Sequence, residues 1–389
     1  PPSIWALGFV SMFMDISSEM IHALLPIYLA TALGASTLAI GFIEGVAEAT
    51  ANITKIFSGA LSDWLGRRKF LTALGYGLAA FTKPIFPLAT TVEWVIAARF
   101  IDRIGKGIRD APRDALVADL TPTSLRGAGF GLRQALDTIG AFAGPLAAIA
   151  LMALTSDNFR LVFWIAVIPA FVALTVMIFA VDEPIRRGAD VRPRLRLADA
   201  KRLSARFWMV VGVATILTLA RFSEAFLILR SQNVGLPVAL APTVMVVMNI
   251  VYAVGAYPAG ALSDRIGRVG LLAAGMACLT IADLILAFGA TVMFTMLGVV
   301  FWGLHMALTQ GLFASLVADT APEEMRGTAF GIFNFAGGLA MLAASVVAGG
   351  LWDVYGPTAT FLAGAAITVV ALIGLVLSHG LNEIIRSSR

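Results

Sequence analysis

Long apolar runs alternate with short polar segments along almost the whole chain. An apolar run of about 20 residues predicts a membrane-spanning helix, because a helix of that length crosses the roughly 30 Å hydrocarbon layer of a bilayer. The pattern therefore predicts an all-α integral membrane protein with 12 transmembrane helices. We place the spans, to within several residues, at about 4–30, 38–61, 70–90, 94–118, 127–154, 161–181, 207–229, 239–262, 269–289, 291–318, 327–350 and 358–380.

Several groups of residues occur twice, about 200 positions apart. The string G-A-L-S-D-x-x-G-R begins at Gly59 and again at Gly260, each time between two apolar runs. Asp119 likewise recurs as Asp319. A parallel repeat of this kind predicts two pseudo-symmetric bundles of six helices each. We expect an N-terminal bundle over 1–181, a basic cytosolic linker over 182–206, and a C-terminal bundle over 207–389.

Composition and charge agree with a membrane protein. Of the 389 residues 59% are hydrophobic and only 13% are charged, whereas about 25% are charged in soluble domains. The net charge of +4 indicates orientation and not nucleic-acid binding, because Lys and Arg gather in the predicted loops on one side. The sequence therefore predicts a bacterial inner-membrane protein in contact with lipid, with both termini in the cytosol.

The predicted span 94–118 is unusually rich in charged residues. With one residue about every 100° around a helix, these side chains fall on one face, which must contact protein or water. Charged groups inside a membrane are costly and indicate a functional site by default, although an ion-pair network that only stabilises the bundle is the alternative. Seven of them are candidates for a substrate cavity: Arg99, Asp102, Arg103, Lys106, Arg109, Asp110 and Arg113.

Other polar residues in the predicted spans extend this interior surface. Asp15 and Glu19 share one face of the first span, and Glu44 and Glu48 share one face of the second. Together with Asp137 in the fifth span, these acids are the candidates for proton coupling, and we expect Asp15 or Glu19, close to Arg99 and Arg103, to carry the proton. The second half contributes fewer candidates to the cavity: Arg221, Glu224, Asn249 and His305.

The repeated string resembles the signature loop of the major facilitator superfamily, in which G-x-L-a-D-r-x-G-r-k joins the second and third spans of each half. The resemblance implies two six-helix bundles that move by alternating access, and a charged network at the cytosolic side that acts as a gate. The residues it singles out are Gly59, Asp63, Gly66, Arg67, Asp119, Arg126, Asp264, Arg268, Asp319 and Arg326.

Two further stretches resemble the proton antiporters of this superfamily, which export drugs and metabolites through 12 spans. Arg99 matches the arginine of their R-x-x-q-G pattern, although Asp102 and Arg103 stand where Gln and Gly are usual. In the fifth span Gly140, Gly144 and Pro145 match their G-x-x-x-G-P motif, which the second half lacks. The resemblance implies coupled export and a bend at the proline.

Motifs of other classes are missing from the sequence. It contains no phosphate-binding G-x-x-x-x-G-K-[ST] loop, no Cys/His metal spacing and no G-x-S-x-G nucleophile motif, so we expect no cofactor, no metal and no catalytic residues. We predict a monomeric, proton-coupled exporter of small organic molecules such as drugs or amphiphilic metabolites. The alternatives are proton-coupled uptake of an organic anion, a membrane-embedded enzyme, or a receptor that senses its ligand without transport.

Overall fold

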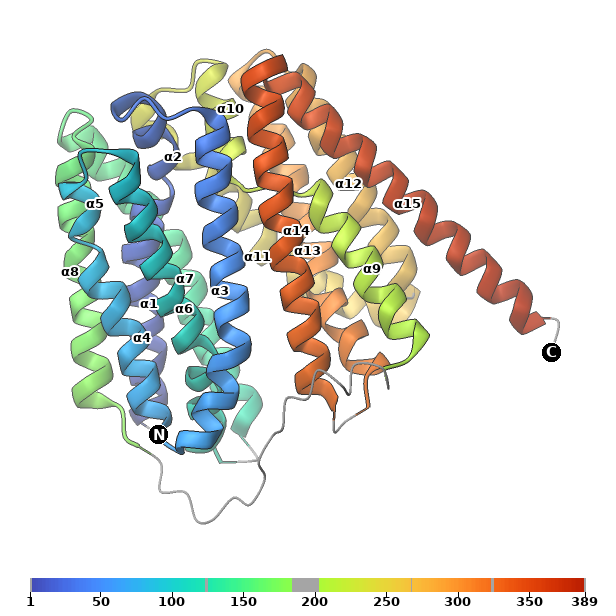
Figure 1. The fold of residues 1–389 in the computed structure, drawn as a ribbon, viewed down its shortest axis with the longest axis horizontal. Helices are drawn as coiled ribbons and strands as arrows, with labels where there is room; N and C mark the ends of the chain where they lie inside the picture. The colour runs from blue at the N-terminus through green and yellow to red at the C-terminus, as the bar shows by residue number, and fades with distance from the viewer. Residues whose placement is uncertain (1, 123–124, 184–202, 267, 323–324, 388–389) are drawn as a thin grey trace. The chain divides into compact units, whose positions relative to one another are not determined.

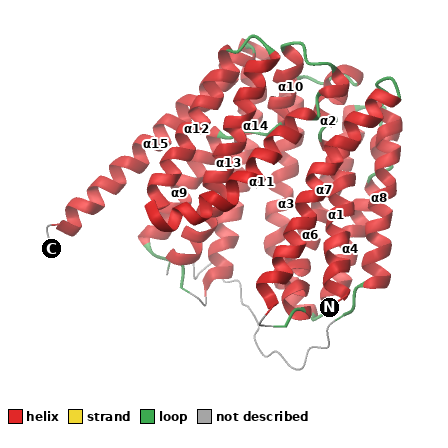
Figure 2. Cartoon of the chain, turned by 180° about the vertical axis from the view of Figure 1, so that it is seen from behind, coloured by secondary structure: helices red, strands yellow, loops and turns green. Residues whose placement is uncertain are grey.

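The structure is a computed structural model that describes residues 2–122, 125–183, 203–266, 268–322 and 325–387. In these ranges it consists of helices and short connections, with no strand (Figures 1 and 2). The first half comprises α1 (Pro2–His22), α2 (Leu25–Ile27), the π-helix η1 (Tyr28–Ala32), α3 (Thr37–Leu65), α4 (Arg68–Thr82), α5 (Ile85–Leu88), α6 (Val92–Leu120), α7 (Arg126–Leu154) and α8 (Phe159–Ala180). The second half comprises α9 (Ala205–Ala220), α10 (Ala225–Asn233), the 3-10 helix η4 (Val238–Leu240), α11 (Thr243–Ile266), α12 (Arg268–Phe288), α13 (Val292–Thr320), α14 (Arg326–Tyr355) and α15 (Pro357–Ser387).

The helices form two compact units. Unit 1 consists of Pro1–Ala35, Val46–Leu195 and Pro237–Thr243, and unit 2 consists of Ser36–Gly45, Arg196–Leu236 and Val244–Arg389. Within unit 1, α1 packs against α7 and α8, and α4 packs against α6 and α8 (Figure 1). Within unit 2, α12 packs against α13 and α15, and α9 packs against α14 and α15. Most of the predicted linker, 184–202, lies outside the described residues.

The observed helices coincide with the predicted spans to within several residues. Nine helical stretches in the described part of the chain are long and apolar enough to cross a membrane. Three further helices do not meet this criterion, since α3 and α6 carry many charges and α4 has only 15 residues. The all-helical membrane architecture is thus confirmed, while the number of twelve spans stays a prediction.

The predicted spans at 4–30 and 207–229 coincide with apolar stretches at Pro2–Ala32 and Ala205–Asn233, but the helix is interrupted within each of them. The first is broken between α1 and α2, where Pro26 lies in the first turn of α2 and has no N–H to continue the hydrogen-bond ladder. The second is broken between α9 and α10 without a proline. There, the Ser345 hydroxyl accepts a hydrogen bond from the Ser223 N–H at 3.2 Å, and the Ser223 hydroxyl accepts one from the Ala225 N–H at 3.2 Å. Hydroxyl groups thus satisfy backbone groups that the break exposes.

Arg230 lies in the last turn of α10. Its side chain is only 7% exposed. The Nε and Nη2 atoms donate hydrogen bonds to the carbonyl oxygens of Leu286 and Gly289, each at 2.8 Å. Because the carbonyl end of a helix carries partial negative charge, this cation stabilises the end of α12.

Candidate functional site

The charged face of α6 lies inside unit 1, as the sequence predicted. Five of its charged residues are less than 10% exposed: Arg99, Asp102, Arg103, Arg109 and Arg113. Small residues permit this packing. Gly75 of α4 faces Gly105 of α6, so closely that a Cβ built on Gly75 would lie 2.6 Å from the Gly105 carbonyl oxygen. Charges inside unit 1 are therefore held against neighbouring helices and must find their partners there.

One group of these charges, the Lys83 cluster, consists of Lys83, Asp102, Arg103, Glu48 and Ser18. Lys83 Nζ lies 2.9 Å from Asp102 Oδ1 and donates a hydrogen bond to the Ser18 hydroxyl at 3.0 Å. Asp102 Oδ2 lies 3.6 Å from Arg103 Nε, and Arg103 Nη1 lies 3.5 Å from Glu48 Oε1. Two cations and two carboxylates thus alternate across α3, α6 and the end of α4, and their charges cancel.

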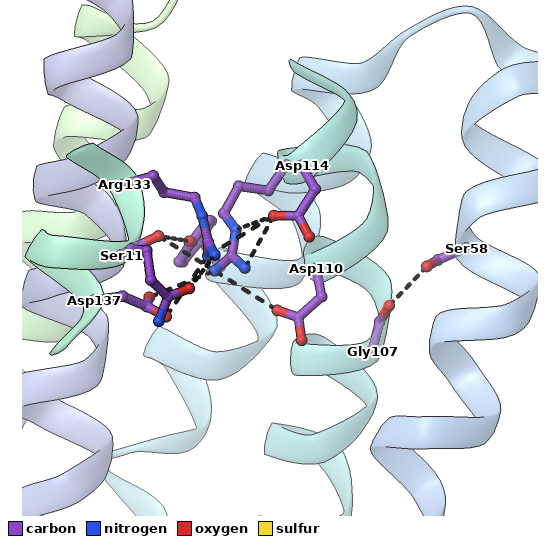
Figure 3. Close-up of polar contacts among 10 residues, drawn as sticks. Ser11, Ser58, Gly107, Asp110, Asp114, Arg133 and Asp137 are labelled. Carbon is purple, nitrogen blue, oxygen red and sulfur yellow. Dashed lines mark hydrogen bonds and ion pairs between the residues drawn. The ribbon is translucent and has the colours of Figure 1, made fainter. Parts of the chain in front are cut away.

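A second group, the Arg113 cluster, is shown in Figure 3 and consists of Arg113, Asp110 and Asp114 of α6 with Arg133 and Asp137 of α7. Arg113 lies 3.2 Å from Asp114, 3.8 Å from Asp110 and 4.0 Å from Asp137. Arg133 lies 3.6 Å from Asp137 and 3.8 Å from Asp114. The cluster thus contains two guanidinium groups and three carboxylates, so its acidic groups outnumber its basic groups.

Asp15 adds a fourth carboxyl group to this excess. It interacts with Asp137 across the contact between α1 and α7, and Lys106 is the cation that acts on its charge. Of the two acids expected near Arg99 and Arg103, Glu19 is the one on whose charge Arg103 acts. Two carboxyl groups in contact cannot both be ionised at low cost. Both residues are partly exposed.

The other predicted proton-coupling residues lie in different surroundings. Glu19 Oε2 lies 3.8 Å from His22 Nδ1, and both Lys106 and Arg103 are close enough to act on its charge. The predicted cavity residue Arg109 also lies in this unit and stacks on Tyr76, with 4.8 Å between the guanidinium carbon and the ring centroid. Glu44 is 1% exposed and lies in the first turns of α3, within the segment Ser36–Gly45 that belongs to unit 2.

Gly140 and Gly144 hold α7 against the two acids of α1. A Cβ built on Gly140 would lie 2.9 Å from Asp15 Cβ, and one built on Gly144 would lie 2.7 Å from Glu19 Cβ. Side chains at either position would push α1 away. The motif that resembles the antiporters therefore positions the two acids singled out in the first span.

We expect Gly144→Val to lower the free energy of unfolding by about 1–3 kcal/mol, because overpacking forces the two helices apart. The matched control is Gly131→Val on the same helix, where a Cβ meets no described atom within 4 Å and the expected change stays within about 0.5 kcal/mol. Denaturant unfolding of the purified proteins in detergent measures both values. Equal stability of the two variants would contradict the proposed contact.

In unit 2 the predicted cavity residues form a smaller polar group. Arg221 Nη2 lies 3.8 Å from Glu224 Oε1, and with the Gln310 amide turned by 180° its oxygen accepts from Arg221 Nη1 at 2.7 Å. His305 is 1% exposed, and its Nδ1 lies 2.9 Å from the Gly275 carbonyl oxygen. Asn249 lies half-buried on α11.

The signature loop of the first half turns at Gly66, whose φ of 65° suits glycine. In the described part of this region Asp119 pairs with Arg68, whose Nη1 lies 2.7 Å from Asp119 Oδ2. Arg68 was not among the predicted gate residues. It directly follows the predicted gate residue Arg67, which is exposed. Asp319 is exposed and Gly59 is half-buried. The side chains of five other predicted gate residues lie outside the described part: Asp63, Arg126, Asp264, Arg268 and Arg326.

Comparison with known proteins identifies the family. The sequence matches the Major Facilitator Superfamily over residues 7–345 and again over 213–380. The chain belongs to this superfamily. It is therefore an integral membrane transporter of small molecules, as the resemblance of its signature loops implied.

Relatives and solved structures agree with this assignment. An uncharacterised MFS-type transporter of Methanocaldococcus jannaschii is 33% identical over 96% of this chain and 94% of that protein. A gentisate transporter of Corynebacterium glutamicum is 26% identical over 84% of this chain and 75% of that protein. The crystal structure of the nucleoside transporter NupG matches 97% of this chain and 99% of its own with a TM-score of 0.79 at 14% identity, which shows a common fold. Superfamily members thus carry different substrates on one architecture.

Proposed function

We propose that the protein is a secondary active transporter that exports small organic molecules in exchange for protons. The observation that carries the proposal is the contact between the carboxyl groups of Asp15 and Asp137 beside the acid-rich Arg113 cluster. A carboxyl pair that shares one proton can release it when nearby cations approach, and bind it again when they withdraw. Such a group couples proton movement to any change in the packing of α1, α6 and α7.

The position of the pair supports coupling to movement. Asp137 is held by Arg113 at 4.0 Å and by Arg133 at 3.6 Å, whereas Asp15 sits on the neighbouring helix. A small displacement of α1 along the glycine contacts therefore changes how strongly the guanidinium groups act on the shared proton. In the alternating-access cycle proposed here, proton binding favours one arrangement of these helices and substrate binding favours the other.

Uptake of an organic anion together with protons is the second candidate. The name of the gentisate transporter favours it, since that relative is named for a compound of this kind. The contacts in unit 1 favour it less, because Lys83, Arg103 and Arg113 all face carboxylates of the chain itself. We therefore retain export of neutral or cationic amphiphilic molecules as the first proposal.

The proposed setting is the bacterial inner membrane, with a monomeric transporter whose termini face the cytosol. The distribution of Lys and Arg in the predicted loops supports this orientation, since cytosolic loops of membrane proteins are enriched in these residues.

Sealed inside-out vesicles with an acidified lumen provide the test. A pH-sensitive dye in the lumen reports proton movement while charged and neutral organic compounds are added outside. Export by antiport predicts that at least one compound accumulates in the lumen while the lumen becomes more alkaline, and that vesicles without the protein show neither change. Accumulation only when compound and protons move in the same direction would replace the first proposal by the second.

A further inference from the structure

A buried carboxyl group in unit 2 takes no part in the proposed exchange at Asp15 and Asp137. Asp283 lies on α12, and its side chain is 0% exposed. Neither of its carboxyl oxygens has a hydrogen-bond or ion-pair partner among the described residues. An ionised carboxylate without a partner is strongly unfavourable in an apolar interior, so this site holds the neutral acid.

In the internal repeat this position corresponds to one member of an ion pair in unit 1. Helices α12 and α13 begin 200 residues after α4 and α6, so that Asp283 corresponds to Lys83 and Trp302 corresponds to Asp102. In unit 1 the two corresponding side chains form the 2.9 Å ion pair of the Lys83 cluster. In unit 2 the partner position holds Trp302, which is 0% exposed and whose indole N–H has no partner in the described part of the chain. The second half therefore has a titratable group at this position, but it lacks the opposite charge that would stabilise the ionised form.

The carboxyl group lies beside the helix break of unit 2. A Cβ built on Gly364 of α15 would lie 2.7 Å from Asp283 Oδ2, 3.1 Å from the Ala220 carbonyl oxygen and 3.2 Å from the ring of Phe222. Ala220 is the last residue of α9, so its carbonyl belongs to the partially negative end of that helix. An ionised Asp283 would face this negative end, whereas a neutral acid can donate a hydrogen bond toward it. The glycine leaves the space in which the carboxyl group sits.

The charged groups of the surrounding helices are engaged with other partners. At the helix break, Arg221 lies near Glu224, and Arg230 of α10 binds the carbonyl oxygens at the end of α12. On α13, His305 contacts the Gly275 carbonyl oxygen. The part of α15 whose side chains are described, 357–375, contains no titratable residue. No described cation is thus paired with Asp283, and a proton is the ligand that fits a fully buried carboxyl group without a partner.

We propose that Asp283 is a second proton-binding site of the transporter, separate from the Asp15–Asp137 pair. The site holds its proton while α9, α12 and α15 are closed around the carboxyl group, and releases it when movement at the helix break admits water. Only the use of this proton in transport rests on the proposed function. The binding of the proton is a property of the site itself and is tested without any transported compound.

Infrared difference spectroscopy of the purified full-length chain in lipid tests the proposal. At neutral pH the wild type should show the carbonyl stretch of a protonated carboxylic acid, and Asp283→Asn should lose this band. The matched control Asp157→Asn alters an exposed carboxyl group in the connection between α7 and α8, and it should retain the band. Loss of only a carboxylate band in Asp283→Asn, or no difference from the wild type, would overturn the proposal.

A second variant keeps the test valid if Asp283→Asn does not fold. Gly364→Ala places a methyl group against the carboxyl oxygen and should shift the frequency of the same band, whereas an unchanged band would count against the site. The two proposals fail separately. A wild type that shows the Asp283 band but no proton-driven transport contradicts the antiport and leaves the proton site standing, and the reverse result contradicts only the site.

Discussion

Asp102→Leu is expected to lower the free energy of unfolding by about 3–5 kcal/mol, because it leaves a buried charge without its partner. Lys83 is 2% exposed, and its ammonium group would keep only the neutral Ser18 hydroxyl at 3.0 Å. Arg103, by contrast, would keep Glu48 at 3.5 Å. Denaturant unfolding of the purified protein in detergent measures the loss.

The double variant Lys83→Met/Asp102→Leu separates an unpaired charge from a simple loss of packing. Replacing both members of a buried ion pair with apolar residues of similar size is often neutral or stabilising, so the double variant should regain most of the stability. The exposed control Asp157→Asn should change it by no more than about 0.5 kcal/mol. If the double variant is as unstable as Asp102→Leu alone, the Lys83 cluster does not act through its charges.

Asp15→Asn is expected to reduce proton-driven transport to the level of vesicles without protein, while exchange of substrate across the membrane continues. The amide cannot share a proton with Asp137, so the proposed coupling group is lost while the shape of the side chain is kept. The measurement compares uphill accumulation under a pH gradient with exchange at equal pH, using a compound found in the vesicle screen.

Two comparisons make this prediction specific. Asp157→Asn should transport like the wild type, since its carboxyl group is exposed. Asp137→Asn should also lose the proton dependence, because it removes the other member of the pair. Should both Asp15→Asn and Asp137→Asn accumulate substrate with normal pH dependence, the proton carrier lies elsewhere, and Glu19, Glu44 and Glu48 are the next candidates.

The sequence was sufficient to predict the helices and the polar face of α6, because both follow from periodic patterns. It also singled out Gly140 and Gly144, and the structure places them against Asp15 and Glu19. The partner of Asp15 could not be predicted, because helical periodicity places side chains on a face but does not say which neighbouring helix that face meets. The contact with Asp137 depends on how α1 and α7 are rotated against each other.

Other features left no signal in the hydrophobic pattern. The break between α9 and α10 contains no proline, and the hydroxyl groups that support it come in part from Ser345, more than a hundred residues away. Arg68 was overlooked beside Arg67, since both are basic residues of one loop and only the packed helices decide which of them reaches Asp119. Long-range contacts of this kind depend on tertiary structure that local sequence patterns do not encode.

The two helix breaks occupy nearly equivalent places in the repeat but are built from different residues. Pro26 lies in the first turn of the short helix after the first break, whereas serine hydroxyl groups support the second break. If both halves descend from one ancestral segment, the break in the helix has been kept in both halves while the residues that form it have changed. Selection has then acted on the bend itself, and each half has been free to acquire its own chemistry around it, a pair of acids in one and a solitary acid in the other.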